Sequence, residues 1–279
     1  MTNNSPPAPR RTAIKQRILT ALVALPLLIA LVGWGSAFLF SCFITLVTLV
    51  GLLELNRMGL GTSQQLEQAL AALLGALCIP ILHSGRYELL LPWAGVSFIL
   101  MAFLFLFRFT TIDGVQLRYA WLCLGWFYLP LLLGHLVVLR QSPFGRRWIF
   151  LTLITVMLCD SFAYFYGRAK GKRKLYPTVS PNKSVEGGIA GVVGAVVAVL
   201  LCKFTFLPMI GLFQAVAIGF ILSLLGQGGD LFESLLKRAC GVKDSGNLIP
   251  GHGGLLDRLD SLLFTFPVVF YIAHYGFGG

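Results

Sequence analysis

The chain has 279 residues, of which 57% are hydrophobic and only 12% are charged, and its mean hydropathy is +0.82. Soluble domains usually carry about 25% charged residues. This composition excludes an ordinary soluble domain and predicts a protein embedded in a membrane. The net charge of +11 then concerns orientation in the bilayer and anionic partners.

Several apolar segments are long enough, or nearly so, to cross a bilayer, which takes roughly 20 mostly apolar residues. The fold class is therefore all-α: a polytopic integral membrane protein with about nine transmembrane helices. Because the first, third and seventh segments are short or closely joined to a neighbour, eight or ten remain open. We expect the segments at about 18–34, 36–55, 66–82, 89–107, 119–138, 148–166, 187–203, 205–225 and 255–275.

Basic residues in the connections predict the orientation. If the N-terminus is cytoplasmic, most of the 22 lysines and arginines lie on that side, as the positive-inside rule expects. Residues 1–17 then form a cytoplasmic tail and 18–140 the N-terminal transmembrane helices. Residues 148–279 form a C-terminal transmembrane region whose two long polar loops, 167–186 and 226–254, face the cytoplasm.

One polar stretch, residues 230–260, lies between apolar segments. Charges near lipid are costly, so a cluster there predicts a functional site. Its charged residues are Asp230, Glu233, Asp244, Asp257 and Asp260, together with Lys237, Arg238, Lys243 and Arg258.

The first half of this stretch suggests a short helix. We expect the three glycines between residues 226 and 229 to end the preceding span. Asp230 would then begin a helix with Asp230, Glu233, Ser234 and Lys237 on one face. An alternative is an ordinary acidic residue at a helix N-terminus followed by a Glu233–Lys237 surface pair.

The second half places Asp257, Asp260 and Ser261 on one face of the helix that becomes the last span. Two aspartates there are expensive unless they are paired or bound to a metal, and Arg258 can neutralise only one of them. Oxygen-only ligands favour Mg²⁺, which one or two carboxylates and substrate phosphates usually hold. His252 is either a phosphate donor, a general acid or a polar turn residue. The cations that can clamp phosphate are Lys237, Arg238, Lys243 and Arg258.

The other polar loop adds two candidates. Asp160 lies inside its span, where it either holds a substrate group or pairs with a cation such as Arg168. Residues 180–184 form a proline-containing turn with Ser180, Lys183 and Ser184 before the next helix. Donors at a helix start suit phosphate binding, although such turns also cap helices for purely local reasons.

Taken in chain order, these motifs resemble the signature of the phosphatidate cytidylyltransferases, also called CDP-diacylglycerol synthases. The clear motifs cover roughly 160–261, whereas the first 150 residues match only in length and hydropathy. The matching residues are Asp160…Gly167-Arg168, Ser180-Pro181-x-Lys183-Ser184-x-Glu186-Gly187, Ser234-x-x-Lys237-Arg238, Lys243-Asp244, Pro250-x-His252-Gly253-Gly254 and Asp257-Arg258-x-Asp260-Ser261.

The resemblance implies that CMP is transferred from CTP to phosphatidate, giving CDP-diacylglycerol and pyrophosphate, with Mg²⁺ and a possible accompanying K⁺. The lipid phosphate would attack the α-phosphorus of CTP in a cavity open to the cytoplasm. The protein would lie in the plasma membrane of a bacterium, among membrane lipids, as a homodimer, with no nucleic-acid partner.

The resemblance also assigns site residues. Asp230 and Asp257 would bind the metal and be catalytic, and we expect Asp260 to be a further metal ligand. Lys183 and Lys237 would complete the catalytic set. Residues expected to bind substrate are Ser180, Ser184, Arg238, Lys243, Asp244, His252 and Arg258.

Two other interpretations remain open. A CTP-using lipid kinase on a similar membrane scaffold would share these motifs. A transporter or cation channel would use Asp160 and Asp257 to line an ion path. The clustering of charge at one face and the lack of paired interrupted segments in corresponding halves favour the transferase over a transporter.

Overall fold

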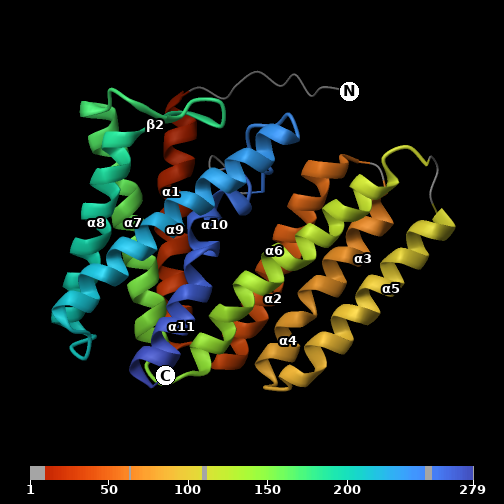
Figure 1. Cartoon of the computed structure of the whole chain (residues 1–279), viewed down its shortest axis with the longest axis horizontal. Helices are drawn as coiled ribbons and strands as arrows, with labels where there is room; N and C mark the ends of the chain where they lie inside the picture. Colours follow the sequence, from red (N-terminus) through yellow and green to blue (C-terminus); the bar gives the residue numbers. More distant parts are fainter. Residues whose placement is uncertain (1–9, 63, 109–111, 249–252, 279) are drawn as a thin grey trace.

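The computed structural model describes residues 10–62, 64–108, 112–248 and 253–278, with side chains from Leu22 onward. The chain forms a helical bundle with one small hairpin at one end (Figure 1). The elements are α1 (Arg10–Trp34), α2 (Ala37–Leu60), α3 (Gln65–Ala76), α4 (Cys78–His83), η1 (Tyr87–Leu89), α5 (Leu90–Arg108), α6 (Val115–Gln141), α7 (Gly145–Lys170), β1 (Lys174–Tyr176), β2 (Ser180–Ser184), α8 (Val185–Thr205), α9 (Leu212–Ala239), α10 (Leu256–Leu263) and α11 (Thr265–Phe277).

The predicted membrane class is confirmed. Within the described residues, seven helical segments are long and apolar enough to cross a bilayer: α2, α3 with α4, η1 with α5, α6, α7, α8 and α9. The apolar part of α1, Leu22–Trp34, is shorter. The predicted last span is divided at Phe264 into α10 and α11. These segments agree with a total of about nine.

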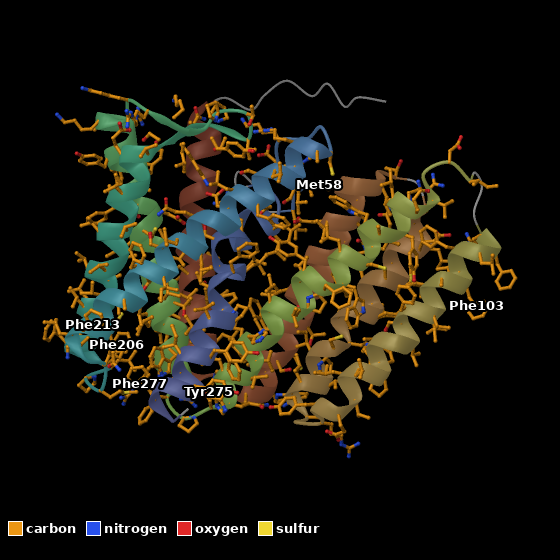
Figure 2. The ribbon with its side chains drawn as sticks, viewed as in Figure 1. Met58, Phe103, Phe206, Phe213, Tyr275 and Phe277 are labelled. Atoms are coloured by element: carbon orange, nitrogen blue, oxygen red, sulfur yellow. The ribbon has the colours of Figure 1, made fainter. Side chains whose placement is uncertain are left out.

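The outer surface of the bundle is apolar, as expected for helices that face lipid. Phe103 and Phe213 lie at opposite outer edges of the molecule (Figure 2), and Phe213 is 85% exposed. The interior instead buries Trp148, Leu129 and Phe266 almost completely. A soluble protein would bury most such aromatic side chains, so this distribution fits a bilayer environment.

Small residues bring α7 and α8 close together. Gly187 and Gly194 lie on the buried face of α8, where a β-carbon would come within 2.8 Å of the carbonyl oxygens of Ala163 and Leu158. Small residues at helix contacts allow close backbone approach in membranes. The contact fixes Asp160, on α7, relative to the start of α8.

The expected end of the span at the glycines near 226–229 is wrong, and so is the predicted loop over the first part of 226–254. Helix α9 continues without interruption to Ala239, so Asp230 lies inside it rather than at a helix start. Gly229 serves a different purpose, because a β-carbon there would overlap the carbonyl oxygen of Asp260. The glycine lets α10 cross α9 closely, and this packing offsets its helix cost of about 1 kcal/mol.

The predicted loop 167–186 is largely ordered secondary structure. Helix α7 continues to Lys170, and β1 and β2 form an antiparallel hairpin in which Lys174 pairs with Ser184 and Tyr176 with Ser180. The Glu186 carboxylate accepts hydrogen bonds from the backbone N–H groups of Lys172 at 3.0 Å and Arg173 at 3.2 Å. The hairpin is thereby fixed to the first turn of α8.

Candidate active site

Residues from β2, α9 and α10 meet at the end of the bundle that carries the hairpin (Figure 1). Lys183 of β2 places its Nζ 2.6 Å from Oδ2 of Asp230, in the second half of α9. Ser234, one turn further along α9, has its Oγ 3.4 Å from Oδ1 of the same aspartate. The two long polar segments of the sequence therefore contribute to one site.

Asp257 of α10 is the most densely contacted carboxylate of this site. Its Oδ1 lies 2.6 Å from Nζ of Lys237, and its Oδ2 accepts the backbone N–H groups of Ser245 at 3.1 Å and Gly254 at 2.8 Å. Lys237 also contacts Oε1 of Glu233 at 3.1 Å, and the Glu233 side chain is only 1% exposed. Lys237 thus forms ion pairs with Glu233 on its own helix, α9, and with Asp257 on α10.

The loop before α10 requires glycine at one position. Gly253 has a φ of +85°, a left-handed conformation that side chains rarely adopt, and a β-carbon there would lie 2.7 Å from Oδ2 of Asp257. The backbone can therefore turn close to the carboxylate. Burial alone favours the neutral acid, but Lys237 and the two amides outweigh it, so the pKa of Asp257 lies below its usual value.

Asp260 lies one turn further along α10, which is outside the seven candidate spans. Its Oδ1 accepts the N–H of Ser261 at 2.7 Å. Burial, reinforced by the nearby Asp230 carboxylate, raises the pKa of Asp260 above its usual value. Asp160 of α7 lies close enough to this group for the charges of Asp230 and Lys183 to act on it.

The carboxylate oxygens of this group suit a hard cation that the chain does not enclose by itself. Asp230, Asp257 and Asp260 offer only oxygen, the ligand type that Mg²⁺ takes. Within the described residues, no three His, Cys, Asp or Glu side chains lie close enough together to hold a metal ion alone. Asp260 makes no ion pair with a described side chain. These carboxylates therefore fit an ion whose coordination is completed by substrate oxygens.

Comparison with known proteins identifies the family. The chain matches the model of the cytidylyltransferase family over residues 15–276. The chain belongs to the cytidylyltransferase family. The predicted resemblance is thus confirmed, and the match includes the N-terminal helices, where the sequence motifs carried no signal.

Curated relatives of the family align over nearly their whole length. The chain is 34% identical over 260 residues to the phosphatidate cytidylyltransferase of Staphylococcus haemolyticus, covering 92% of this chain and 97% of the relative. Identity to the protein of the same name from Bacillus subtilis is 34% over 267 residues, covering 93% and 97%. For that of Staphylococcus aureus (strain COL) it is 32% over 269 residues, covering 92% and 97%.

The remaining predicted site residues occupy different settings. Ser184 is buried and caps α8, because its Oγ accepts the N–H of Gly187 at 3.1 Å. Arg238 is exposed and donates to the carbonyl oxygens of Val179 at 3.4 Å and Val242 at 3.1 Å. Ser180 is half-buried at the start of β2, while Lys243, Asp244 and Arg258 are exposed. His252 lies outside the described residues.

The sequence motifs missed one residue that contacts the family's polar segments, Glu54 of α2. It is buried, and its Oε2 accepts the backbone N–H of Leu256 at 3.0 Å and the hydroxyl of Ser245 at 3.4 Å. A signal was present, because Glu54 is an acid inside a predicted span. It lacked a motif around it, so its neighbours became apparent only from the fold.

Proposed function

We propose that the chain is a phosphatidate cytidylyltransferase, which transfers CMP from CTP to phosphatidate in phospholipid biosynthesis. The observation that carries this proposal is the meeting of Asp230 with Lys183 and of Asp257 with Lys237 at one end of the bundle. The family match and the names of the aligned relatives support the choice of reaction.

The proposed reaction needs little proton transfer. A phosphate oxygen of phosphatidate attacks the α-phosphorus of CTP, a new phosphorus–oxygen bond forms, and the bond to the bridging oxygen breaks. The electron pair leaves with pyrophosphate. Because the lipid phosphate is already an anion, the main barriers are the approach of two anions and the charge that develops on pyrophosphate.

The lysines of the site answer that electrostatic problem. Lys183 and Lys237 each lie 2.6 Å from an aspartate oxygen, so their ammonium groups are held in place beside the carboxylates. Held cations stabilise developing phosphate charge without reorganising at the moment of reaction. We propose that Ser180, Ser184, Arg238, Lys243, Asp244, His252 and Arg258 contact the substrates around this centre.

We propose that Asp230, Asp257 and Asp260 hold Mg²⁺, no more than two of them on any one ion, and that K⁺ accompanies it. The ion would neutralise phosphate charge and polarise the reacting phosphoryl group. The chain's own contribution is to fix the carboxylates: α9 carries Asp230, and α10 carries Asp257 and Asp260 one turn apart. Phosphate oxygens of CTP would complete the coordination, as is common for Mg²⁺.

We further propose that the site faces the cytoplasm of a bacterium, where CTP is available, and that the protein lies in the plasma membrane as a homodimer. Exposed basic residues from the last turns of α7 to the start of β1 support this orientation, because positive charge favours the cytoplasmic side. The residues are Arg168, Lys170, Lys172, Arg173 and Lys174.

The test is an assay of the purified chain in detergent micelles with phosphatidate and CTP. We expect CDP-diacylglycerol and pyrophosphate to form with Mg²⁺, and formation to stop when the metal is chelated. Asp230→Asn should abolish the reaction, because it removes a proposed metal ligand and the partner of Lys183. Phosphorylated lipid with CDP as products, or solute flux in proteoliposomes without CTP consumption, would overturn the proposal.

A further inference from the structure

Glu54 joins the N-terminal helices to the polar connection between α9 and α10. The residues that donate hydrogen bonds to it, Ser245 and Leu256, lie 191 and 202 positions further along the chain. Helices α2 and α10 also contact each other. The end of α2 therefore contacts the segment that carries the proposed metal ligands.

The hydrogen-bond donors to Glu54 are adjacent in the chain to the hydrogen-bond donors to Asp257. Ser245 offers its hydroxyl to Glu54 and its backbone N–H to Asp257 at 3.1 Å. Gly254 donates its N–H to Asp257 at 2.8 Å, and two residues later Leu256 donates its N–H to Glu54. One buried carboxylate thus ties together the two backbone segments that supply both amide donors of Asp257.

The location of this carboxylate at the first helical residue of α10 is electrostatically favourable. Leu256 begins the helix, and the free N–H groups at a helix start carry partial positive charge. That effect is smaller than the free-energy cost of removing a carboxylate from water.

Glu54 lacks the compensation that another buried acid of the same half receives. Glu67 of α3 is buried and pairs with Nε of Arg108 at 3.0 Å. Glu54 makes no ion pair with any described basic side chain, and its Oε1 is buried without a described hydrogen-bond partner. The two hydrogen bonds at Oε2 are therefore the compensation that the structure describes for burying this acid.

We infer that Glu54 is a positioning residue for Asp257: it holds the Ser245 and Gly254 segments so that their amides fix the carboxylate for divalent-cation binding. This inference rests on the proposed metal site. Partners of a metal ligand that act through hydrogen bonds typically change metal affinity by about 10- to 100-fold when they are removed. The inference adds a residue of the N-terminal helices to a site otherwise formed by residues of the C-terminal region.

The test measures binding of Mn²⁺, a paramagnetic substitute for Mg²⁺, by water-proton relaxation. The full chain in detergent would be saturated with a CTP analogue whose α,β-bridging oxygen is replaced by methylene, so no turnover occurs. We expect Glu54→Met, which removes the acceptor but fills the space, to weaken Mn²⁺ about 10-fold. Glu54→Gln, which keeps one acceptor oxygen, should weaken it by about threefold. The number of sites per chain should not change.

The order of the two variants separates positioning from charge, because both remove the negative charge and only Glu54→Met removes the acceptor. Equal weakening in both variants, or affinities within about twofold of the original in both, would overturn the inference. So would a loss of sites at unchanged affinity, which is the signature of partial unfolding. If Glu54→Met does not yield folded protein, Glu54→Ala replaces it with the same expectations.

Two controls keep this inference distinct from the proposed function. Glu67→Met removes a buried acid from the same half and should leave the affinity for Mn²⁺ unchanged. Asp257→Asn should remove Mn²⁺ binding. If Asp257→Asn binds like the original chain, the proposed metal site fails. If Asp257→Asn loses binding while the Glu54 variants retain it, only the role of Glu54 fails.

Discussion

The ion pairs of buried acids differ between the N-terminal and the C-terminal helices. Glu67 and Arg108 form a pair between α3 and α5. In the C-terminal helices, Lys237 instead joins Glu233 to Asp257, and two backbone amides hold the other oxygen of Asp257. A single pair between neighbouring helices suits packing, whereas connected charges at one end of the bundle suit binding of an ionic ligand. The arrangement of the charges therefore distinguishes the site from the scaffold.

Replacement of Asp257 should give the largest effect. Asp257→Asn removes the charge that Lys237 and the two amides hold, and we expect CMP transfer to fall by about 10³-fold. Initial rates with labelled CTP in micelles measure this. Glu67→Gln is the matched control in the N-terminal half and should retain turnover. Near-normal rates for Asp257→Asn would contradict the view that the C-terminal charges serve the reaction whereas the N-terminal pair serves packing.

Loss of Lys237 should affect stability most. Lys237→Met leaves Glu233, which is 1% exposed, without its cation, and breaking a buried pair in this way costs about 3–5 kcal/mol. Thermal unfolding in detergent should show a lower midpoint, and adding Glu233→Gln should recover part of it. An unchanged midpoint would show that these charges are not coupled.

Two adjacent glycines of α9 offer a sharper contrast. Gly229→Ala places a methyl group against the Asp260 carbonyl oxygen, and we expect a loss of about 1–3 kcal/mol, with reduced activity because α10 must move. Gly228→Ala meets no atom within 4 Å and should stabilise α9 by about 1 kcal/mol. Similar melting curves for both variants would contradict the close crossing of α9 and α10.

The smallest effect concerns the cap of α8. Ser184→Ala removes the acceptor of the Gly187 N–H, and we expect the free energy of unfolding to fall by about 1 kcal/mol. Ser184→Asn should restore it, because asparagine is also a good cap. Unchanged stability in Ser184→Ala would contradict the capping role. If Ser184 also contacts substrate, Ser184→Asn should raise the KM for CTP even though stability is restored.

The sequence predicted those site residues that stand out from their immediate neighbours in the chain. Asp230, Lys237, Asp257 and Asp260 stand out because charges between apolar segments are costly, and their spacing along a helix needs no tertiary information. The contact between Lys183 and Asp230 links two motifs that had each been singled out. The membrane class followed from hydropathy alone.

The features that were missed depend on contacts between distant parts of the chain. Gly229 looked like a helix break in the sequence. The structure explains the glycine by the close crossing of α10, where the carbonyl oxygen of Asp260 leaves no room for a β-carbon. Glu54 had no motif because its partners are Ser245 and Leu256, about two hundred residues away. Neither spacing nor composition predicts such a contact, which exists only once the helices pack.

The central claim is that the connected charges of the C-terminal helices catalyse CMP transfer, and the most direct measurement follows two labels on CTP. The purified chain would be given phosphatidate, Mg²⁺ and CTP labelled at either the α- or the γ-phosphorus. We predict that the α-label enters the lipid and the γ-label leaves in pyrophosphate, and that neither moves without the metal. Entry of the γ-label into the lipid, or transfer that persists when the metal is chelated, would contradict the claim.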